Sequence, residues 1–172
     1  KIILTNKNMR TSSRNLYIVK GSERSLMIDT SWNVPECLSE MEQALNELSI
    51  DCRDLDIFVT HNHVDHSGYV SFFTDRGARA FMNPVEIAAS SDRYHRFYED
   101  NDMRRSYTGE VGVTKERTPD AWQEIKAGAD QLAKDNNVNF DFPFTPIAPG
   151  DRLSYGGYDF EVVSLAGHTS GQ

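Results

Sequence analysis

The first third of the chain alternates between short apolar runs and polar turns. Residues 15–19 and 25–29 are mostly apolar, and the polar segment 21–24 separates them. This pattern predicts two β-strands joined by a tight turn. Asp29 would then stand at the end of the second strand.

A helix is predicted next, because apolar side chains recur at helical spacing after a start signal at Asn33 and Pro35. These apolar side chains are Leu38, Met41, Leu45 and Leu48. Residues 56–60 then form a short run of strand-favouring side chains, which is typical of a buried strand. That run leads directly into His61.

The alternation of helix and strand signals continues through the middle of the chain. Residues 69–73 carry three aromatic side chains and predict a helix that stops at Gly77, and residues 78–82 predict a strand. Asn83 and Pro84 predict the start of another helix, since Asn favours the capping position and Pro the first helical position.

The last part of the chain combines a charged segment with a hairpin. Residues 91–137 are charged and helical in pattern, so we predict a helical insertion within the domain. Strand signals return at residues 152–155 and 158–165, on either side of Gly156-Gly157. Two glycines between strands are typical of a two-residue hairpin turn.

Composition limits the class of protein. With 172 residues, 38% of them hydrophobic and 10% aromatic, the chain fits a single domain with its own core. The formal net charge of −8 argues against broad affinity for nucleic acid or anionic lipid, and no apolar run is long enough to span a membrane. The two cysteines, Cys37 and Cys52, are too few for a disulfide framework, so we predict a cytoplasmic protein.

Both ends of the chain are abrupt. Lys1 leads at once into an apolar run without a signal-peptide pattern, and Gln172 directly follows a glycine-rich turn. We therefore expect the chain to be a segment of a longer protein.

Candidate metal ligands are concentrated in the segment His61-Asn62-His63-Val64-Asp65-His66, which holds three of the five histidines. In an extended backbone His61 and His63 point the same way, so one ion can take both. Where the chain turns into a helix, Asp65 and His66 address a second position, and metals in two-metal hydrolytic sites lie about 3.5–4 Å apart. Zinc accepts both imidazole nitrogen and carboxylate oxygen. The alternative interpretation is a polar, solvated turn at the end of a strand.

A second candidate is the segment Gly167-His168-Thr169-Ser170-Gly171. The flanking glycines let the backbone turn sharply and present an imidazole with few steric limits. Taken alone, this segment indicates an ordinary turn. Together with the first cluster, it predicts that His168 supplies the third histidine of a three-histidine metal site.

These two motifs resemble the signature of the metallo-β-lactamase-fold superfamily. Asp29 matches that superfamily's first motif, an acidic residue that supports the metal-binding loop from outside the ligand shell. The resemblance implies an α/β fold. In this fold, residues 1–172 would form the N-terminal half of an αββα sandwich, with residues 91–137 inserted.

The resemblance also implies a set of ligands. His61, His63 and His168 would hold a first metal ion, and Asp65 and His66 would belong to a second. In the superfamily the second site also takes a bridging Asp and a final His from the C-terminal half, which this chain does not contain. The implied cofactor is zinc, as one or two ions, with iron or manganese as alternatives.

The implied function is that of a metal-dependent hydrolase. A metal-bound hydroxide would attack an ester, thioester, lactone or amide carbonyl of a small substrate, with Asp65 as the catalytic residue that orients the nucleophile. One alternative is an oxidoreductase that resembles the superfamily's persulfide dioxygenases, which use a single iron. Another is a catalytically incomplete fragment. We expect a small-molecule substrate and no nucleic-acid or membrane partner. An incomplete fragment could also pair with a second copy as a homo-oligomer, since exposed sheet edges favour pairing.

Overall fold

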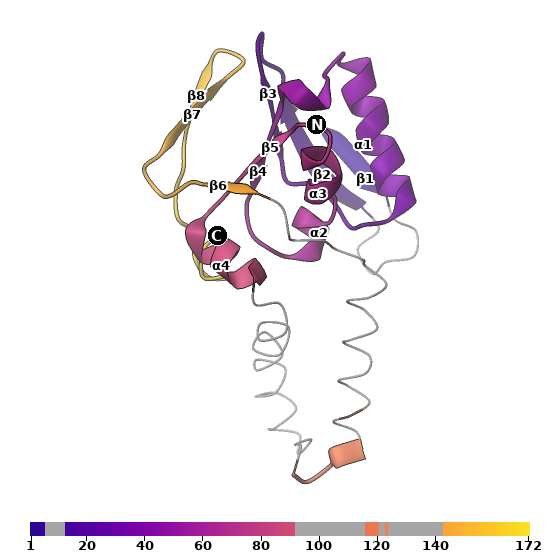
Figure 1. Ribbon diagram of the computed structural model, residues 1–172, viewed down its shortest axis with the longest axis vertical. Coiled ribbons are helices and arrows are strands. Elements are labelled where there is room, and N and C mark those ends of the chain that lie inside the picture. The colour runs from indigo at the N-terminus through magenta and orange to yellow at the C-terminus, as the bar shows by residue number, and fades with distance from the viewer. Residues whose placement is uncertain (6–12, 92–115, 121–122, 124–142) are drawn as a thin grey trace.

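The computed structural model describes residues 1–5, 13–91, 116–120, 123 and 143–172. Within these ranges six strands form one mixed sheet and two more form a hairpin. Figure 1 shows the hairpin set apart from the sheet. The strands are β1 (Ile2–Thr5), β2 (Ser13–Val19), β3 (Ser25–Ile28), β4 (Leu55–Val59), β5 (Arg79–Met82), β6 (Phe144–Pro146), β7 (Arg152–Tyr155) and β8 (Tyr158–Glu161). The helices are α1 (Pro35–Glu47), α2 (Val64–Ser67), α3 (Val70–Thr74) and α4 (Pro84–Ser91), with a 3-10 turn at Cys52–Asp54.

The large sheet follows the order of the strands along the chain, from β1 to β6. β1, β2 and β3 pair antiparallel, and the pair β2–β3 is the hairpin that the sequence predicts. From β3 onward the strands are parallel, because helices carry the chain back between them. Parallel strands place their carboxyl ends, and the loops that follow, at one edge of the sheet.

The hydrophobic core lies between one face of this sheet and the helices α1 and α3. α1 begins at Pro35, within the predicted start signal, with Val34 at the capping position. Its buried side chains are Cys37, Met41 and Leu45. They pack with core side chains of the sheet and of α3, among them Leu16, Met27, Leu55, Ile57 and Phe73. Full burial of such a side chain contributes about 1.5–3 kcal/mol to stability.

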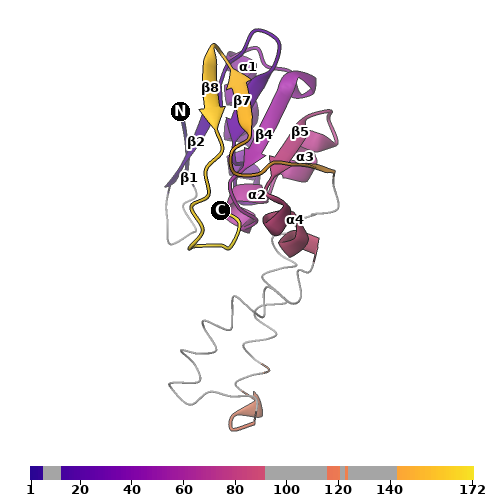
Figure 2. The ribbon, with the colours of Figure 1, turned by 90° about the vertical axis from the view of Figure 1, so that its left-hand side faces the viewer.

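The opposite face of the sheet carries the hairpin β7–β8, and Figures 1 and 2 show this hairpin on the side away from α1. The Tyr155 hydroxyl of the hairpin donates a hydrogen bond to Asp56 of β4. Asp56 also accepts hydrogen bonds from the guanidinium groups of Arg24 and Arg79. The Tyr155–Asp56 bond thus joins the hairpin to the sheet, and the two guanidinium groups compensate the buried carboxylate that accepts this bond.

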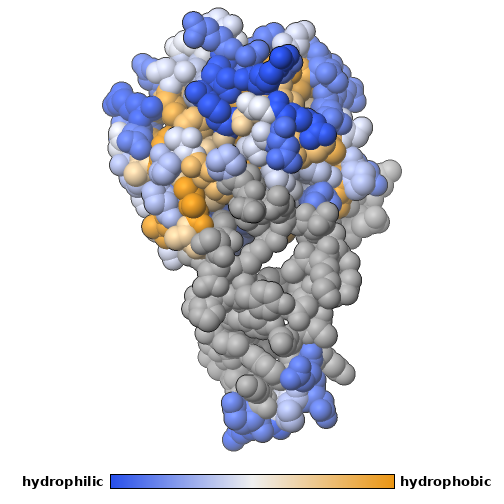
Figure 3. Space-filling model, in the orientation of Figure 1, coloured by the Kyte–Doolittle hydropathy of each residue, from blue (hydrophilic) through white to orange (hydrophobic). Residues whose placement is uncertain are grey.

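An apolar groove of about 250 Å³ separates the hairpin from the sheet. Its lining includes Leu26, Phe58 and Phe160. A few residues after Phe160 in the chain, the large apolar side chains of Val163 and Leu165 are exposed. On the side seen in Figure 3, apolar surface lies among hydrophilic patches.

The largest differences between the structure and the sequence predictions concern three strands. β1 and β6 were not predicted, and β8 ends at Glu161 rather than at residue 165. Beyond the strand, Val162 still exchanges hydrogen bonds with Gly150 and Asp151, after which the chain leaves the hairpin. The predicted insertion over residues 91–137 lies almost wholly outside the described residues.

Among the described residues, no helix combines the length and the apolar character that crossing a membrane requires.

Candidate metal centre

The first ligand loop, residues 60–66, begins where the central parallel strand β4 ends. His63 occupies the capping position of α2, and its carbonyl oxygen accepts hydrogen bonds from the N–H groups of His66 and Ser67, both at 2.9 Å. Asp65 and His66 consequently lie in the first turn of α2. A strand end followed at once by a short helix therefore presents all the ligands predicted in this segment.

Thr30 and Gly68 hold the first ligand loop against the turn that follows β3. The Thr30 N–H and hydroxyl both donate to the carbonyl oxygen of His66, at 2.7 and 2.9 Å. A Cβ atom on Gly68 would lie 2.4 Å from the carbonyl oxygen of Ser31 and 2.7 Å from that of Val64. Glycine is therefore required at this position for lack of space.

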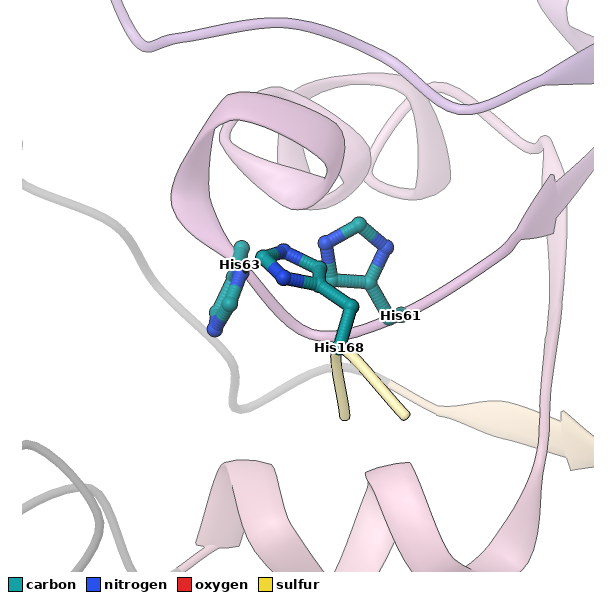
Figure 4. Close-up of side chains that lie close together, drawn as sticks. All are labelled: His61, His63 and His168. Atoms are coloured by element: carbon teal, nitrogen blue, oxygen red, sulfur yellow. Dashed lines mark hydrogen bonds between the residues drawn. The ribbon is translucent and has the colours of Figure 1, made fainter. Parts of the chain in front are cut away.

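The second ligand loop, residues 167–171, follows the hairpin. The Gly167 N–H donates to the carbonyl oxygen of Thr169 at 3.0 Å, which closes a tight turn. Thr169 is buried, whereas His168 is exposed and reaches toward the first ligand loop, as Figure 4 shows. The second ligand loop is thus a tight turn that carries His168 at its exposed side.

The structure brings together His61, His63 and His168. One ring nitrogen from each can be chosen so that the three atoms lie within 4.8 Å of one another. His63 Nδ1 and His168 Nε2 are 3.0 Å apart, although 105 positions separate these residues along the chain. The ring centroids lie 4.7 to 4.9 Å apart. His61 is only 2% exposed, so the group extends from the interior to the surface.

Asp29 contacts the first ligand loop through both of its carboxylate oxygens. Its Oδ1 accepts a hydrogen bond from the Thr60 N–H at 2.8 Å, and its Oδ2 accepts one from the Thr60 hydroxyl at 3.0 Å. Oδ2 also lies 2.7 Å from Nδ1 of His66. One carboxylate therefore contacts both ends of the loop.

These contacts fix which nitrogen of His61 carries the proton. An ionised carboxylate only accepts hydrogen bonds, so the single hydroxyl hydrogen of Thr60 is used on Asp29. The Thr60 oxygen, 3.0 Å from His61 Nδ1, must then accept a hydrogen bond from that nitrogen. The proton of neutral His61 therefore sits on Nδ1, and the electron pair that a metal would take sits on Nε2. In neutral His66 the proton likewise sits on Nδ1, because this nitrogen faces the carboxylate of Asp29, which accepts hydrogen bonds.

Asp65 and His66 lie beside the three histidines. The rings of His61 and His66 are 4.0 Å apart between centroids, and His66 Nε2 is 3.8 Å from Asp65 Oδ2. The carboxylate of Asp65 is one-quarter exposed. Both residues thus adjoin the group, but they are not among the three whose ligand atoms cluster.

The donor atoms fit a divalent metal ion. Three imidazoles match the His₃ set of catalytic zinc sites, in which the fourth position takes water or substrate. Two nitrogens on one tetrahedral zinc lie about 3.3–3.4 Å apart, close to the 3.0 Å between His63 and His168. Imidazole also suits iron, so these residues suit a divalent metal ion without selecting a particular metal.

Two residues near the site were missed by the sequence reasoning. Thr60 joins Asp29 to His61 through its hydroxyl. Glu86, fully buried in the first turn of α4, accepts hydrogen bonds from both ligand loops. A signal existed for Glu86, because an Asn followed three positions later by Glu marks a helix start. That signal explains a helix cap and gives no hint of a contact with the loops.

Comparisons with known proteins agree with this geometry. No protein-family model and no curated protein matches the chain. Among solved structures, a metallo-beta-lactamase family protein from Thermus thermophilus is 24% identical with a TM-score of 0.67, over 98% of this chain and 52% of that one. A beta-lactamase domain protein from Burkholderia ambifaria is 17% identical, also with a TM-score of 0.67, over 97% of this chain and 47% of that one.

A subclass B3 metallo-beta-lactamase of Bradyrhizobium japonicum is similar at 17% identity and a TM-score of 0.53, over 91% of this chain and 47% of its own. The chain thus has the metallo-β-lactamase fold. It spans about half the length of the structures that it matches. The resemblance seen in the two histidine motifs is confirmed at the level of the fold.

Proposed function

We propose that this chain carries the metal site of a hydrolase that acts on the carbonyl group of a small substrate. The observation that carries the proposal is the convergence of His61, His63 and His168, from two separate loops, on one group of nitrogens. These residues would hold a divalent metal ion, which would lower the pKa of a bound water molecule toward about 7 and polarise a carbonyl oxygen.

The protein's own residues divide the remaining work. Asp29 and Thr60 hold His61 as the Nδ1–H tautomer. In this tautomer Nε2 carries no proton that would have to leave before a metal binds. Asp65 adjoins the histidine group with a partly exposed carboxylate, which suits it to orient an attacking water and to accept its proton. We therefore assign Asp65 as the general base.

A small ester, thioester, lactone or amide is the substrate class that we propose. A formal net charge of −8 repels polyanions such as nucleic acid, whereas small acyl compounds need no extended basic surface. The similar structures include proteins named as metallo-beta-lactamases, which supports hydrolysis.

The test is turnover by the zinc-loaded chain of a panel made of a nitrophenyl ester, a thioester, a lactone and a chromogenic β-lactam. We expect at least one member to be hydrolysed, and Asp65→Asn to lower kcat by about 10²-fold or more while the zinc content is retained. Glu36→Gln, which also replaces a carboxylate by an amide but at an exposed position of α1, should leave turnover unchanged. Zinc bound at the histidines without turnover of any panel member would contradict the proposal.

A further inference from the structure

The carboxylate of Glu86 is completely buried, which is costly for a charged group unless hydrogen bonds compensate it. Glu86 lies in the first turn of α4, behind Asn83 and Pro84. The helix start is capped by Asn83, whose Oδ1 accepts a hydrogen bond from the Val85 N–H at 2.9 Å. Because Asn83 makes this cap, other contacts must explain why the Glu86 carboxylate is buried.

Both oxygens of Glu86 accept hydrogen bonds from outside its own helix. Oε2 accepts from the N–H of Asn62 at 2.9 Å, and Asn62 stands between the candidate ligands His61 and His63. Oε1 accepts from the N–H of Gly171 at 2.8 Å, three residues after His168. A single carboxylate therefore bridges the first and the second ligand loop.

The approach of the second loop to this carboxylate depends on Gly171. A Cβ atom at that position would lie 2.9 Å from both Cγ and Oε1 of Glu86 and 3.0 Å from Cβ of Val85. Any side chain here would push the loop and the carboxylate apart. The contact thus combines a buried charge, two charge-assisted hydrogen bonds and a glycine that permits close packing.

We propose that Glu86 is a positioning residue that clamps the His168 loop to the His61–His63 loop, so that the three-histidine group is assembled before a metal binds. This inference rests on the metal site in the proposed function. Glu86 acts through hydrogen bonds to the backbones of Asn62 and Gly171. Its effect is to bring His168, which follows the hairpin β7–β8 in the chain, next to the two histidines that follow β4.

The test compares cobalt(II) binding by the wild-type chain, Glu86→Gln, His168→Ala and the double variant, followed by the visible absorption of the bound ion. In Glu86→Gln one oxygen becomes an NH₂ group that cannot accept a hydrogen bond, so one loop is released. We expect about 10- to 100-fold weaker binding. We also expect His168→Ala to cost about tenfold or more in the wild type and little in the Glu86→Gln background.

Two control variants separate positioning from general stability. Glu36→Gln removes an exposed carboxylate and should bind cobalt like the wild type. Leu45→Ala weakens the core beneath α1, outside both loops, and should keep the full effect of His168→Ala. Equal losses of affinity in Glu86→Gln and Leu45→Ala, or the same cost of His168→Ala in every background, would overturn the proposal.

A second measurement needs no metal. In the metal-free chain, we expect slow hydrogen exchange at the amides of Asn62 and Gly171, followed by NMR. Gly171→Ala displaces Glu86 and should speed exchange at Asn62, on the other loop. Unchanged exchange at Asn62 would overturn the clamp. If the wild type binds no cobalt, the proposed function fails, and this exchange measurement still decides the role of Glu86.

Discussion

Asp29 adopts a left-handed backbone conformation, with φ of 61°, that few residues other than Gly, Asn and Asp tolerate. This turn follows β3 and lets its carboxylate reach both Thr60 and His66. The sequence indicated a supporting role for Asp29 because the residue matches a motif. It gave no indication of Thr60, because a threonine at the end of a strand is explained equally well by strand propensity.

The Thr60 hydroxyl is expected to matter for metal affinity although it is not itself a ligand. Thr60→Val keeps the shape of the side chain but removes the acceptor for His61 Nδ1–H, so the tautomer is no longer fixed. We expect affinity for zinc to fall about 10- to 100-fold, measured by competition with a chromophoric chelator. Thr145→Val, the same change at an exposed position of β6, is the control. Equal affinity of both variants would refute the tautomer assignment.

Gly68 is expected to be intolerant of substitution for steric reasons. A Cβ atom there would meet three backbone atoms within 2.8 Å, and the backbone cannot move aside as a flexible side chain can. Gly68→Ala should lower the free energy of unfolding by about 1–3 kcal/mol or more, measured by urea denaturation. Gly167→Ala, where the nearest atom is 3.9 Å away, should cost much less. A smaller effect at Gly68 than at Gly167 would contradict the packing described.

The regular elements were largely predictable, because most of them bury one face and show it as periodicity. α1 and the parallel strands β4 and β5 follow their apolar patterns within one or two residues. β6 could not be recognised, since three residues that end in Pro146 carry no periodic pattern. Its edge position in the sheet tolerates the proline.

The hairpin β7–β8 depends on a buried charge, so its attachment should depend on pH. Burial alone would raise the pKa of Asp56, but hydrogen bonds from Arg79, Arg24 and Tyr155 outweigh burial and hold that pKa below its ordinary value. Asp56 therefore stabilises the fold above its unfolded-state pKa of about 3.9, and this contribution is lost as the pH falls through the lower folded-state pKa.

Asp56→Asn should reveal this pH dependence. At pH 7 we expect a loss of about 2–4 kcal/mol in the free energy of unfolding, because two guanidinium groups lose their carboxylate. The difference from the wild type should shrink in acid, measured by urea denaturation between pH 7 and 3. Asp75→Asn, at an exposed position, should show little difference at any pH. A difference in unfolding free energy for Asp56→Asn that grows in acid would contradict a lowered pKa of Asp56 in the folded state.

Across the whole molecule, the candidate site joins two distant parts of the chain. The residues of each ligand loop were recognisable from local motifs, since metal ligands cluster in type and spacing. How His168 is brought to the other two histidines was not recognisable, because it depends on the hairpin, on Glu86 and on Gly171 together. Contacts over such distances leave no periodic signal in a sequence.

Metal content per chain, measured by elemental analysis after zinc loading and dialysis, shows whether the three histidines bind a metal ion. We predict about one equivalent in the wild type, lost in a His61→Ala/His63→Ala double variant that remains folded by circular dichroism. The remaining histidine outside the two motifs provides a control, as His95→Ala should retain the metal. A folded wild type without bound zinc, or a double variant that keeps it, would contradict a metal site built from His61, His63 and His168.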